Sequence, residues 1–508
     1  MVILLKILLA ALASAGILVL SACGQQEIKV DKNVQENKVG SGNSQPAEIK
    51  EFDVTAEEVK WELNSEHQIM AYTYGGTVPG EEIRVKEGKT VKINFTNNLK
   101  VPTTIHWHGV PVPNEQDGIP GVTQDAVLPG ETYTYQFTAE NPGTYWYHTH
   151  QNGAEMIDKG LYGTFIIEPE QGNPIDKDYT LVLDEWESSK LNREITSYHG
   201  DSMAHGGHSS DQEQGMMEHN MDSYDIYTIN GKTYDSTSPL KVKKGDKVKL
   251  RFVNAGYIVH KMHIPIEYKV THVDGQEVNA PKDEDGSILE IAPGERFDIE
   301  FSADGEDNFT IDNHVSRKAA KDMRIDVVYV DGKTETQSHT EESKEVDLTN
   351  LGEYTEGPFS LEDSFDTEYE MDLGAAMSDE GMKMVWTINN EVYPDTKPFE
   401  VKKGEKVKVR LVNNSMDDSV HPMHLHGHFF QVLSKDGKPL KGSPIIKDTL
   451  NVKPGETYEV AFLADNPGNW LFHCHDLHHA SNGMVTAIKY KGFEPSYKDT
   501  GKVENQPE

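Results

Sequence analysis

Residues 466–475 have the sequence NPGNWLFHCH, and residues 141–150 have the sequence NPGTYWYHTH. The two stretches align without a gap, so that Thr149 stands where Cys474 stands. The apolar and aromatic residues before each His-x-His pair are typical of a β-strand. A strand places the two imidazoles on one face and the middle side chain on the other. The stretches therefore indicate two related β-domains that each present paired histidines.

A second pattern occurs three times, as VKEGKTVKINFTN, VKKGDKVKLRFVN and VKKGEKVKVRLVN, at residues 85–97, 242–254 and 401–413. Each copy is followed by Pro-Gly-Glu and another alternating strand, beginning at Pro129, Pro293 and Pro454. The copies lie about 160 residues apart, which is the length of a domain. We therefore expect three homologous all-β sandwich domains, at residues 51–169, 178–329 and 365–491.

The N-terminus has the pattern of an export signal. Lys6 precedes an apolar run, and the run ends in Leu-Ser-Ala-Cys at residues 20–23, which resembles a bacterial lipobox. We therefore expect cleavage of residues 1–22 and a lipid on Cys23. The polar residues up to position 50 would form a flexible stalk, and the protein would be anchored at the outer face of the cell membrane.

Composition limits the possible partners. The formal net charge is -36, which excludes a nucleic-acid binder because phosphates need a basic surface. The chain has two cysteines. Because the expected lipid occupies Cys23, Cys474 has no disulfide partner, and a lone thiol in an exported protein favours metal ligation. We expect a monomer.

Five His-x-His pairs occur, at 106/108, 148/150, 424/426, 426/428 and 473/475. Random placement of the 22 histidines would give about one such pair. Imidazole suits copper and zinc, and a thiolate among imidazoles suits copper. The histidines of the second domain, His260 and His263, do not follow this pattern, and we expect them to be ordinary packing or surface residues.

Four motifs in this order resemble the multicopper oxidase family. They are His106-Trp107-His108-Gly109, His148-Thr149-His150, the stretch HPMHLHG at residues 421–427, and His473-Cys474-His475 followed by His479 and Met484. The resemblance extends from about residue 51 to residue 491. It implies three cupredoxin-like Greek-key domains, four copper ions, dioxygen as the electron acceptor and water as its product.

The resemblance also implies a ligand set for each copper. Type 1 copper would be held by His421, Cys474 and His479, with Met484 as a weak axial ligand. Type 2 copper would be held by His106 and His424. The two type 3 coppers would be held by His108, His148 and His475 and by His150, His426 and His473. Met423 lies between two of these ligands and is expected to pack. The trinuclear cluster would therefore lie between the first and third domains.

Water formation needs a proton donor. Asp117 occupies the position where the family has an acidic residue near the type 2 copper. Many bacterial relatives have Glu directly after the second type 1 histidine, where this chain has Ala480. We predict that Asp476 takes over the proton relay, with His478 as a weaker candidate and ligand orientation as the alternative role of Asp476.

The reducing substrate stays open between two classes. The first class that the family resemblance implies is a laccase-like oxidase of phenols and aromatic amines. A His- and Met-rich segment at residues 199–221, and Met371, Met377, Met382 and Met384, favour a metallo-oxidase of Cu(I), with Fe(II) or Mn(II) as further donors. The alternative for Met382 and Met384 is packing before a strand. A copper-sequestering surface lipoprotein is a third hypothesis, but storage alone needs no trinuclear oxygen site.

Overall fold

The computed structural model of the chain describes residues 48–172, 174–191, 221–330, 332, 336–337, 343–378, 383–415 and 419–507. The predicted signal peptide, lipid site and most of the stalk lie outside these residues. So do Met382 and, apart from Met221, the His- and Met-rich segment. Among the described residues, no helix has the length and apolar character needed to cross a bilayer.

The first domain consists of two four-stranded sheets. One has the order β2-β1-β4-β6 and the other β3-β8-β7-β5. The bounds are β1 Ile49–Glu62, β2 Gln68–Tyr74, β3 Gly80–Lys86, β4 Thr90–Asn97, β5 His106–His108, β6 Thr132–Thr138, β7 Gly143–His148 and β8 Tyr162–Glu168. The short helices η1 Asn114–Gln116 and α1 Gly153–Ile157 connect them.

The second domain repeats this arrangement with larger sheets, ordered β10-β9-β12-β18-β14-β15 and β11-β20-β19-β13-β17, with β16 added to β14 and β21 to β19. The strands are β9 Lys177–Trp186, β10 Ile226–Ile229, β11 Leu240–Val242, β12 Lys247–Asn254, β13 His260–His263, β14 Glu267–Val273, β15 Gln276–Glu277, β16 Asp283–Asp285, β17 Ile288–Ile291, β18 Arg296–Ser302, β19 Asn308–Asn313, β20 Arg324–Tyr329 and β21 Thr336–Gln337. The helical turns are η2 Met221–Ser223, η3 Tyr234–Ser236, η4 Ala319–Asp322 and, before the third domain, η5 Leu348–Asn350.

The third domain has the orders β23-β22-β25-β31-β27-β28, with β29 added to β27, and β24-β33-β32-β26-β30. The strands are β22 Thr367–Met377, β23 Met384–Ile388, β24 Phe399–Val401, β25 Lys406–Asn413, β26 His421–Leu425, β27 Phe430–Lys435, β28 Lys438–Pro439, β29 Ile445–Lys447, β30 Thr449–Val452, β31 Thr457–Leu463, β32 Asn469–Cys474 and β33 Val485–Tyr490. Helix α2 Leu477–Ser481 follows β32.

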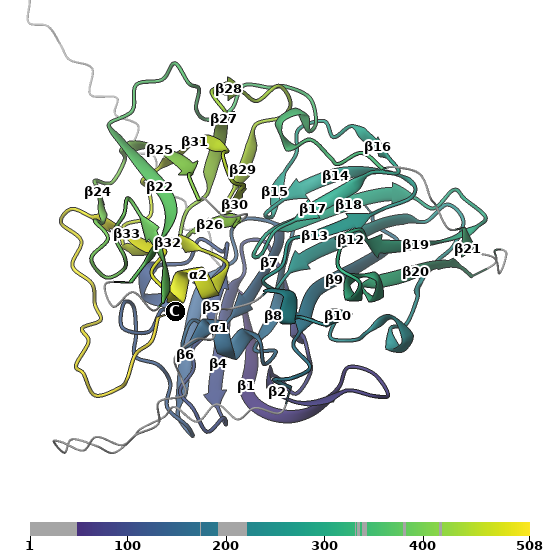
Figure 1. Cartoon of the computed structure of the whole chain (residues 1–508), viewed down its shortest axis with the longest axis horizontal. Coiled ribbons are helices and arrows are strands. Elements are labelled where there is room, and N and C mark those ends of the chain that lie inside the picture. The colour runs from purple at the N-terminus through teal and green to yellow at the C-terminus, as the bar shows by residue number, and fades with distance from the viewer. Residues whose placement is uncertain are drawn as a thin grey trace, which may run out of the picture. The chain divides into compact units, whose positions relative to one another are not determined.

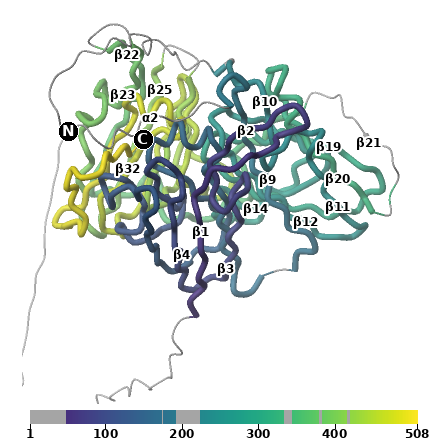
Figure 2. The backbone as a smooth tube through the Cα atoms, turned by 90° about the horizontal axis from the view of Figure 1, so that it is seen from below, coloured from purple at the N-terminus to yellow at the C-terminus, as the bar shows by residue number. Residues whose placement is uncertain are grey.

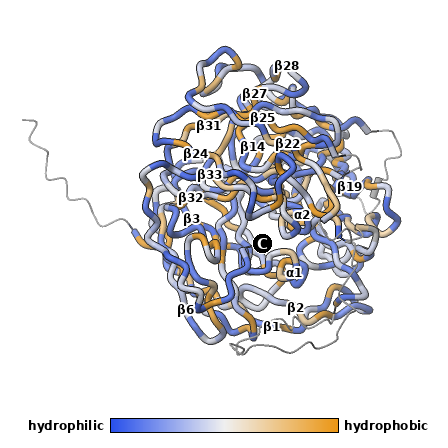
Figure 3. The backbone as a smooth tube through the Cα atoms, turned by 60° about the vertical axis from the view of Figure 1, so that its left-hand side comes forward, coloured by the Kyte–Doolittle hydropathy of each residue, from blue (hydrophilic) through white to orange (hydrophobic). Residues whose placement is uncertain are grey.

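The three sandwiches have equivalent strand orders, as their shared sequence pattern predicts. In each, the repeated Val-Lys segment forms a central strand, β4, β12 or β25, paired with the strand that follows Pro-Gly-Glu. Alternate side chains of β4 are buried, because one face of this strand packs on the core. Figure 1 shows the three domains in successive colours, and Figure 3 shows apolar stretches along their strands. The predicted all-β, cupredoxin-like fold is confirmed.

The strands that carry the predicted copper ligands are buried on both faces. Every residue of β7 and β26 is buried, and so is every residue of β32 after Asn469. A sheet strand buried on both faces must be covered by a second layer on each side. Two clusters of buried apolar side chains supply the cores. One lies within the first domain, and the other runs through the second and third domains and includes first-domain residues such as Ile69, Trp146 and Tyr162.

Candidate metal centres

The single thiol of the described chain lies among two imidazoles. Sγ of Cys474, the last residue of β32, is 3.8 Å from Nδ1 of His421 and 3.6 Å from Nδ1 of His479. The sheet brings His421 close because Met423 of β26 pairs with Cys474. Helix α2 brings His479 back toward β32. One thiolate and two imidazoles within 4.8 Å of one another are the donor set of a mononuclear copper site.

Met484, the predicted axial ligand, lies beside two of the predicted type 1 ligands through main-chain hydrogen bonds. It is fully buried, its main-chain N–H donates to His479, and its carbonyl accepts from the N–H of Cys474 at 3.1 Å. The turn after α2 therefore holds the thioether-bearing residue against both predicted type 1 ligands. Met423, in contrast, is buried in the core, as predicted for a packing residue.

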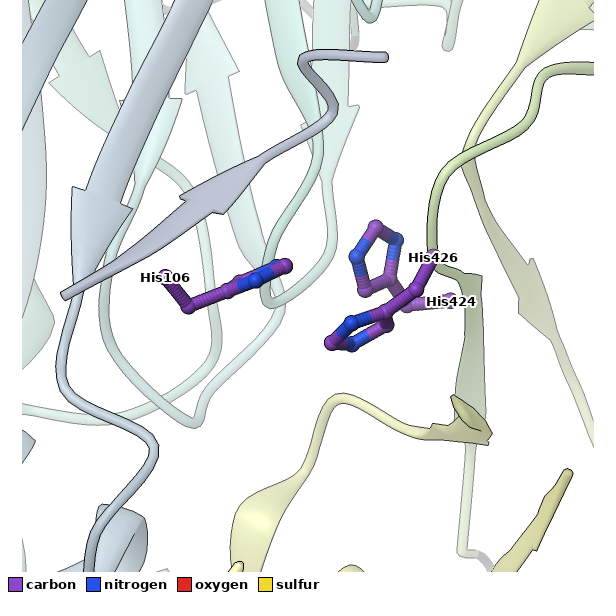
Figure 4. Close-up of side chains that lie close together, drawn as sticks. All are labelled: His106, His424 and His426. Carbon is purple, nitrogen blue, oxygen red and sulfur yellow. The ribbon is translucent and has the colours of Figure 1, made fainter. Parts of the chain in front are cut away.

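Eight further histidines converge between the first and third domains. They are His106, His108, His148, His150, His424, His426, His473 and His475. In Figure 4, His106 faces His424 and His426 across the junction of these two domains, and the three rings bring ligand nitrogens within 4.8 Å of one another. His150, His426 and His473 form another such group. Each domain supplies four rings, so neither domain holds the full set.

Several ring nitrogens of this cluster are buried without a hydrogen bond to the described protein. They are His106 Nε2, His108 Nδ1, His148 Nε2, His424 Nε2 and both nitrogens of His475. A buried polar atom without a partner is costly, and such atoms need an explanation. Bound metal ions supply it, because neutral imidazole nitrogens are metal ligands. The residues present therefore fit a copper cluster.

The surroundings keep these imidazoles neutral. Burial, reinforced by repulsion from neighbouring rings, holds the pKa of His108, His148 and His475 well below the usual value of histidine. The same two causes lower the pKa of His150, His426 and His473. A neutral ring keeps one lone pair for a metal, so the site needs no deprotonation before it binds a cation.

The division of the eight rings among three ions stays a prediction, because rings of different predicted sets are as close as rings of one set. The centroids of His106 and His426 are 4.1 Å apart, and those of His108 and His424 are 3.7 Å apart. Within the predicted type 3 set of His108, His148 and His475, the centroid distances are 4.7, 5.3 and 5.7 Å.

Asp117 links rings from both domains. Its carboxylate oxygens lie 3.2 Å from His106 Nδ1 and 3.0 Å from His426 Nδ1, and its side chain is almost fully buried. The turn after η1 can reach this place because residue 118 is a glycine. A Cβ on Gly118 would lie 1.8 Å from the carbonyl oxygen of Ile105. The sequence predicted an acid near the type 2 copper, and Asp117 contacts a ring of that predicted site.

Asp476 lies at the mononuclear site. It caps the N-terminus of α2 by accepting from the N–H of His478, and its other oxygen is 3.4 Å from His479 Nε2. Burial raises the pKa of Asp476 to about 7, although the two main-chain N–H donors oppose the shift. This position suits orientation of the His479 ring, and the proton-relay role stays a prediction.

The second domain supplies a support that the sequence patterns did not indicate. The guanidinium of Arg296 makes two hydrogen bonds to Asp448, and Asp448 Oδ1 lies 3.2 Å from His108 Nε2 and 3.4 Å from His424 Nδ1. Burial alone would raise the pKa of Asp448, but the charge of Arg296 lowers it below the usual range. In the sequence, the one feature that could have pointed to this support is the position of Arg296 directly after the second Pro-Gly-Glu.

The second domain's own histidines have local partners, as predicted. His260 is buried, with Nε2 3.0 Å from Glu185 and Nδ1 3.0 Å from the amide of Asn313. His263 lies 3.4 Å from Asp312. Neither residue contributes to the two histidine clusters of the described chain.

A cavity of about 570 Å³ opens beside His479. Its lining includes Met221, Tyr257, His314, Arg317, Asp476 and His479. On another side of the His479 ring, Trp386 of β23 stacks at 4.4 Å between centroids. The cavity therefore opens onto one side of the predicted ligand His479, and the Trp386 ring packs on another side of it.

Comparison with known proteins assigns the class. The family model described as multicopper oxidase matches residues 54–172, 178–334 and 366–492. The chain belongs to the multicopper oxidase family, and its cofactor is therefore copper. This is consistent with the converging histidines and with Cys474.

The chain resembles particular members of this family. It is 30% identical over 446 residues to multicopper oxidase MmcO of Mycobacterium tuberculosis, covering 83% of each chain. It is 24% identical over 570 residues to copper resistance protein A of Escherichia coli, covering 86% of this chain and 92% of the relative. The crystal structure of a multi-copper oxidase from Pseudomonas thermotolerans matches with a TM-score of 0.66 and 26% identity, over 88% of this chain and 100% of that one.

Proposed function

We propose that this protein oxidises a small reducing substrate one electron at a time at the mononuclear site and reduces dioxygen to water at the trinuclear site. His421, Cys474 and His479 would hold the type 1 copper, with Met484 as axial ligand. His106 and His424 would hold the type 2 copper, and the other six cluster histidines the type 3 pair. Copper supplies one-electron redox chemistry at the first site and multi-electron reduction of dioxygen at the second.

The connection through Cys474 carries this proposal. Cys474 contacts the rings of the mononuclear site, and its chain neighbours His473 and His475 belong to the cluster of eight. Because successive strand residues point to opposite faces, one tripeptide supplies ligands on both sides. A continuous covalent path therefore joins the two ligand sets, and a storage site would have no use for it.

The proposed reductant is a phenol or aromatic amine. The cavity beside His479 has the volume of a small-molecule site, for which about 300–1,000 Å³ is usual. Its wall holds both apolar surface and hydrogen-bonding groups, from Tyr257, Arg317 and Asp476. An aromatic ring with a hydroxyl or amine group could therefore pack there with its polar group near His479.

Oxidation of Cu(I) is the second candidate, and one hairpin favours it. Met377 of β22 and Met384 of β23 are directly opposite each other and exposed, at 58% and 38%. Paired residues share a face, and Trp386, two residues along β23, has the same facing and stacks on His479. Thioethers select Cu(I). Relatives named copper resistance protein A are consistent with this candidate.

Oxygen uptake separates the candidates. We expect consumption of dioxygen with 2,6-dimethoxyphenol over many turnovers, and none in a Cys474→Ser variant. A double variant, Met377→Leu with Met384→Leu, removes both exposed sulfurs and keeps a similar side-chain volume. The control is Met371→Leu, which removes a buried sulfur from the same strand as Met377, β22. Turnover with Cu(I) alone, lost in the double variant and kept in the control, would overturn the phenol assignment. Copper binding without turnover would identify a sequestering protein.

We also propose that the protein works at the outer face of the cell membrane, held by a lipid on Cys23. The Leu-Ser-Ala-Cys pattern at residues 20–23 supports this. Metabolic labelling with a fatty acid should mark the wild-type protein and leave a Cys23→Ser variant unmarked. Labelling of both, or of neither, would contradict the proposal.

A further inference from the structure

The chain does not end with the last strand of the third domain. After β33, residues 497–507 run along the first domain. Figure 2 shows the yellow C-terminal part of the chain beside the dark blue strands of the first domain. The Tyr497 hydroxyl donates to Asp125 at 2.6 Å, and the Asn505 amide donates to the same carboxylate at 3.0 Å. The side-chain oxygen Oδ1 of Asn505 accepts from the main-chain N–H of Ala126 at 2.9 Å. Asp125 is therefore the anchor of this segment.

The end of the segment reaches Gln151 and Asn152, which directly follow the second predicted copper motif, His148-Thr149-His150. The carbonyl of Gln506 accepts from the N–H of Asn152 at 2.9 Å, and its N–H donates to the Gln151 side chain at 2.9 Å. The Gln151 amide in turn donates to the carbonyl of Glu504 at 3.0 Å. Residues 504–506 thus contact the side chain of Gln151 and the main chain of Asn152.

The last contact is made to a cluster ring. Nδ1 of His150 hydrogen-bonds to the carbonyl oxygen of Pro507, 357 positions away in the sequence. The equivalent contacts of His106, His148, His424 and His473 are made to carbonyls at most 24 positions away. His150 therefore takes its orienting acceptor from a segment outside the sandwiches.

We propose that residues 497–507 are a working part of the trinuclear site, which they complete by holding the His150 ring and by limiting solvent access beside it. This rests on the proposed cluster. A hydrogen bond at one imidazole nitrogen fixes the tautomer and leaves the other nitrogen for the metal. Here Pro507 occupies Nδ1, so Nε2 is left to share an ion with His426 and His473.

The segment is also built to open more easily than the sheets. Six of its eleven residues are exposed, none is fully buried, and it adds no strand to a sheet. Segments of this kind open with lower free energy than core strands. Since the cluster lies at the end of the segment, its release would uncover the His150 edge and leave the rest of the fold in place.

The test compares Asn505→Ala, a deletion of residues 496–508, and the control Lys502→Ala, which changes an exposed residue of the same segment. In copper-loaded protein, we expect Asn505→Ala and the deletion to bind azide faster and to lose cluster copper to a chelator about 10- to 100-fold more readily. The blue absorption of the mononuclear site should be unchanged. The control should behave as wild type.

Amide hydrogen exchange of metal-free protein gives a second readout. We expect the Asn152 amide to exchange faster in Asn505→Ala than in the control. If the wild type holds cluster copper and neither azide binding, copper retention nor exchange changes in Asn505→Ala, the inference is wrong and the proposed function stands. If the wild type holds copper only at the mononuclear site, the proposed cluster itself is wrong. Asn505→Ala keeps the test decisive if the deletion does not fold.

Discussion

Arg296 and Asp448 form a buried, two-bonded ion pair between the second and third domains, with Nη1–Oδ1 and Nη2–Oδ2 distances of 2.7 and 2.6 Å. Both side chains are fully buried. Gly109 allows the pair to lie beside the first copper motif, because a Cβ there would be 2.4 Å from Nη2 of Arg296. Through Asp448 the pair supports His108 and His424, so a domain without cluster ligands helps to position rings from the other two.

Loss of Arg296 should therefore destabilise the protein strongly. Arg296→Ala leaves the Asp448 carboxylate buried without its cation, which costs about 3–5 kcal/mol in comparable cases. Denaturant unfolding of metal-free protein measures this. The control is Arg410→Ala, which breaks an exposed pair with Glu370 and should cost less than about 1 kcal/mol. Equal losses in both variants would show that the buried pair has no special role.

Asp117→Asn should slow oxygen reduction without removing copper. The amide can still contact one of the two rings that Asp117 bridges, but it cannot carry a proton. Loss of a general acid or base lowers a rate by about 10²- to 10⁴-fold. We therefore expect the variant to consume oxygen more slowly while its copper content stays that of wild type. Unchanged oxygen uptake would contradict a proton-transfer role for Asp117.

If Asp476→Asn keeps wild-type turnover across pH, the predicted proton relay through Asp476 is wrong.

Asp158 should make stability depend on pH. Burial raises its pKa to about 8 from 3.8, although the Tyr224 hydroxyl at 3.0 Å opposes the shift. Between about pH 4 and pH 8 the folded protein holds a proton that the unfolded chain releases, so stability falls as pH rises. The slope is at most about 1.4 kcal/mol per pH unit. Because Asp158 keeps some solvent contact, the pH range over which stability falls should be narrower than this pKa implies.

Asp158→Asn isolates this effect from other titrating groups, because an amide oxygen can still accept from Tyr224. The variant's unfolding free energy, measured on metal-free protein, should fall less than that of wild type over the same pH range. Parallel curves for the two proteins would show that Asp158 is ionised throughout this range.

The copper ligands could be predicted from sequence because each requirement leaves a local pattern. The His-x-His pairs are visible when residues 148–150 are aligned with residues 473–475, and a strand places both imidazoles of a pair on one face. The repeated segments indicate how many sandwich domains the chain has and where they lie along it. The structure then brings the motifs together through β5–β7 and β26–β32 pairing.

The supports could not be predicted in this way, because they depend on distance in space. Arg296 and Asp448 are 152 positions apart, and each looks like an ordinary charged residue in its strand region. Pro507 acts through its carbonyl, which every residue has, so no side-chain pattern marks it. The contact between Asp476 and His479 forms because α2 turns the chain back between them, and their spacing in the sequence does not by itself show that turn.

We propose that Cys474 joins a mononuclear copper site to a trinuclear one. Copper content and visible absorption of wild type and Cys474→Ser test it most directly. We expect four copper ions and intense blue absorption in the wild type, and three ions without that absorption in the variant. A variant that keeps the blue absorption, or a wild type that binds a single ion, would contradict it.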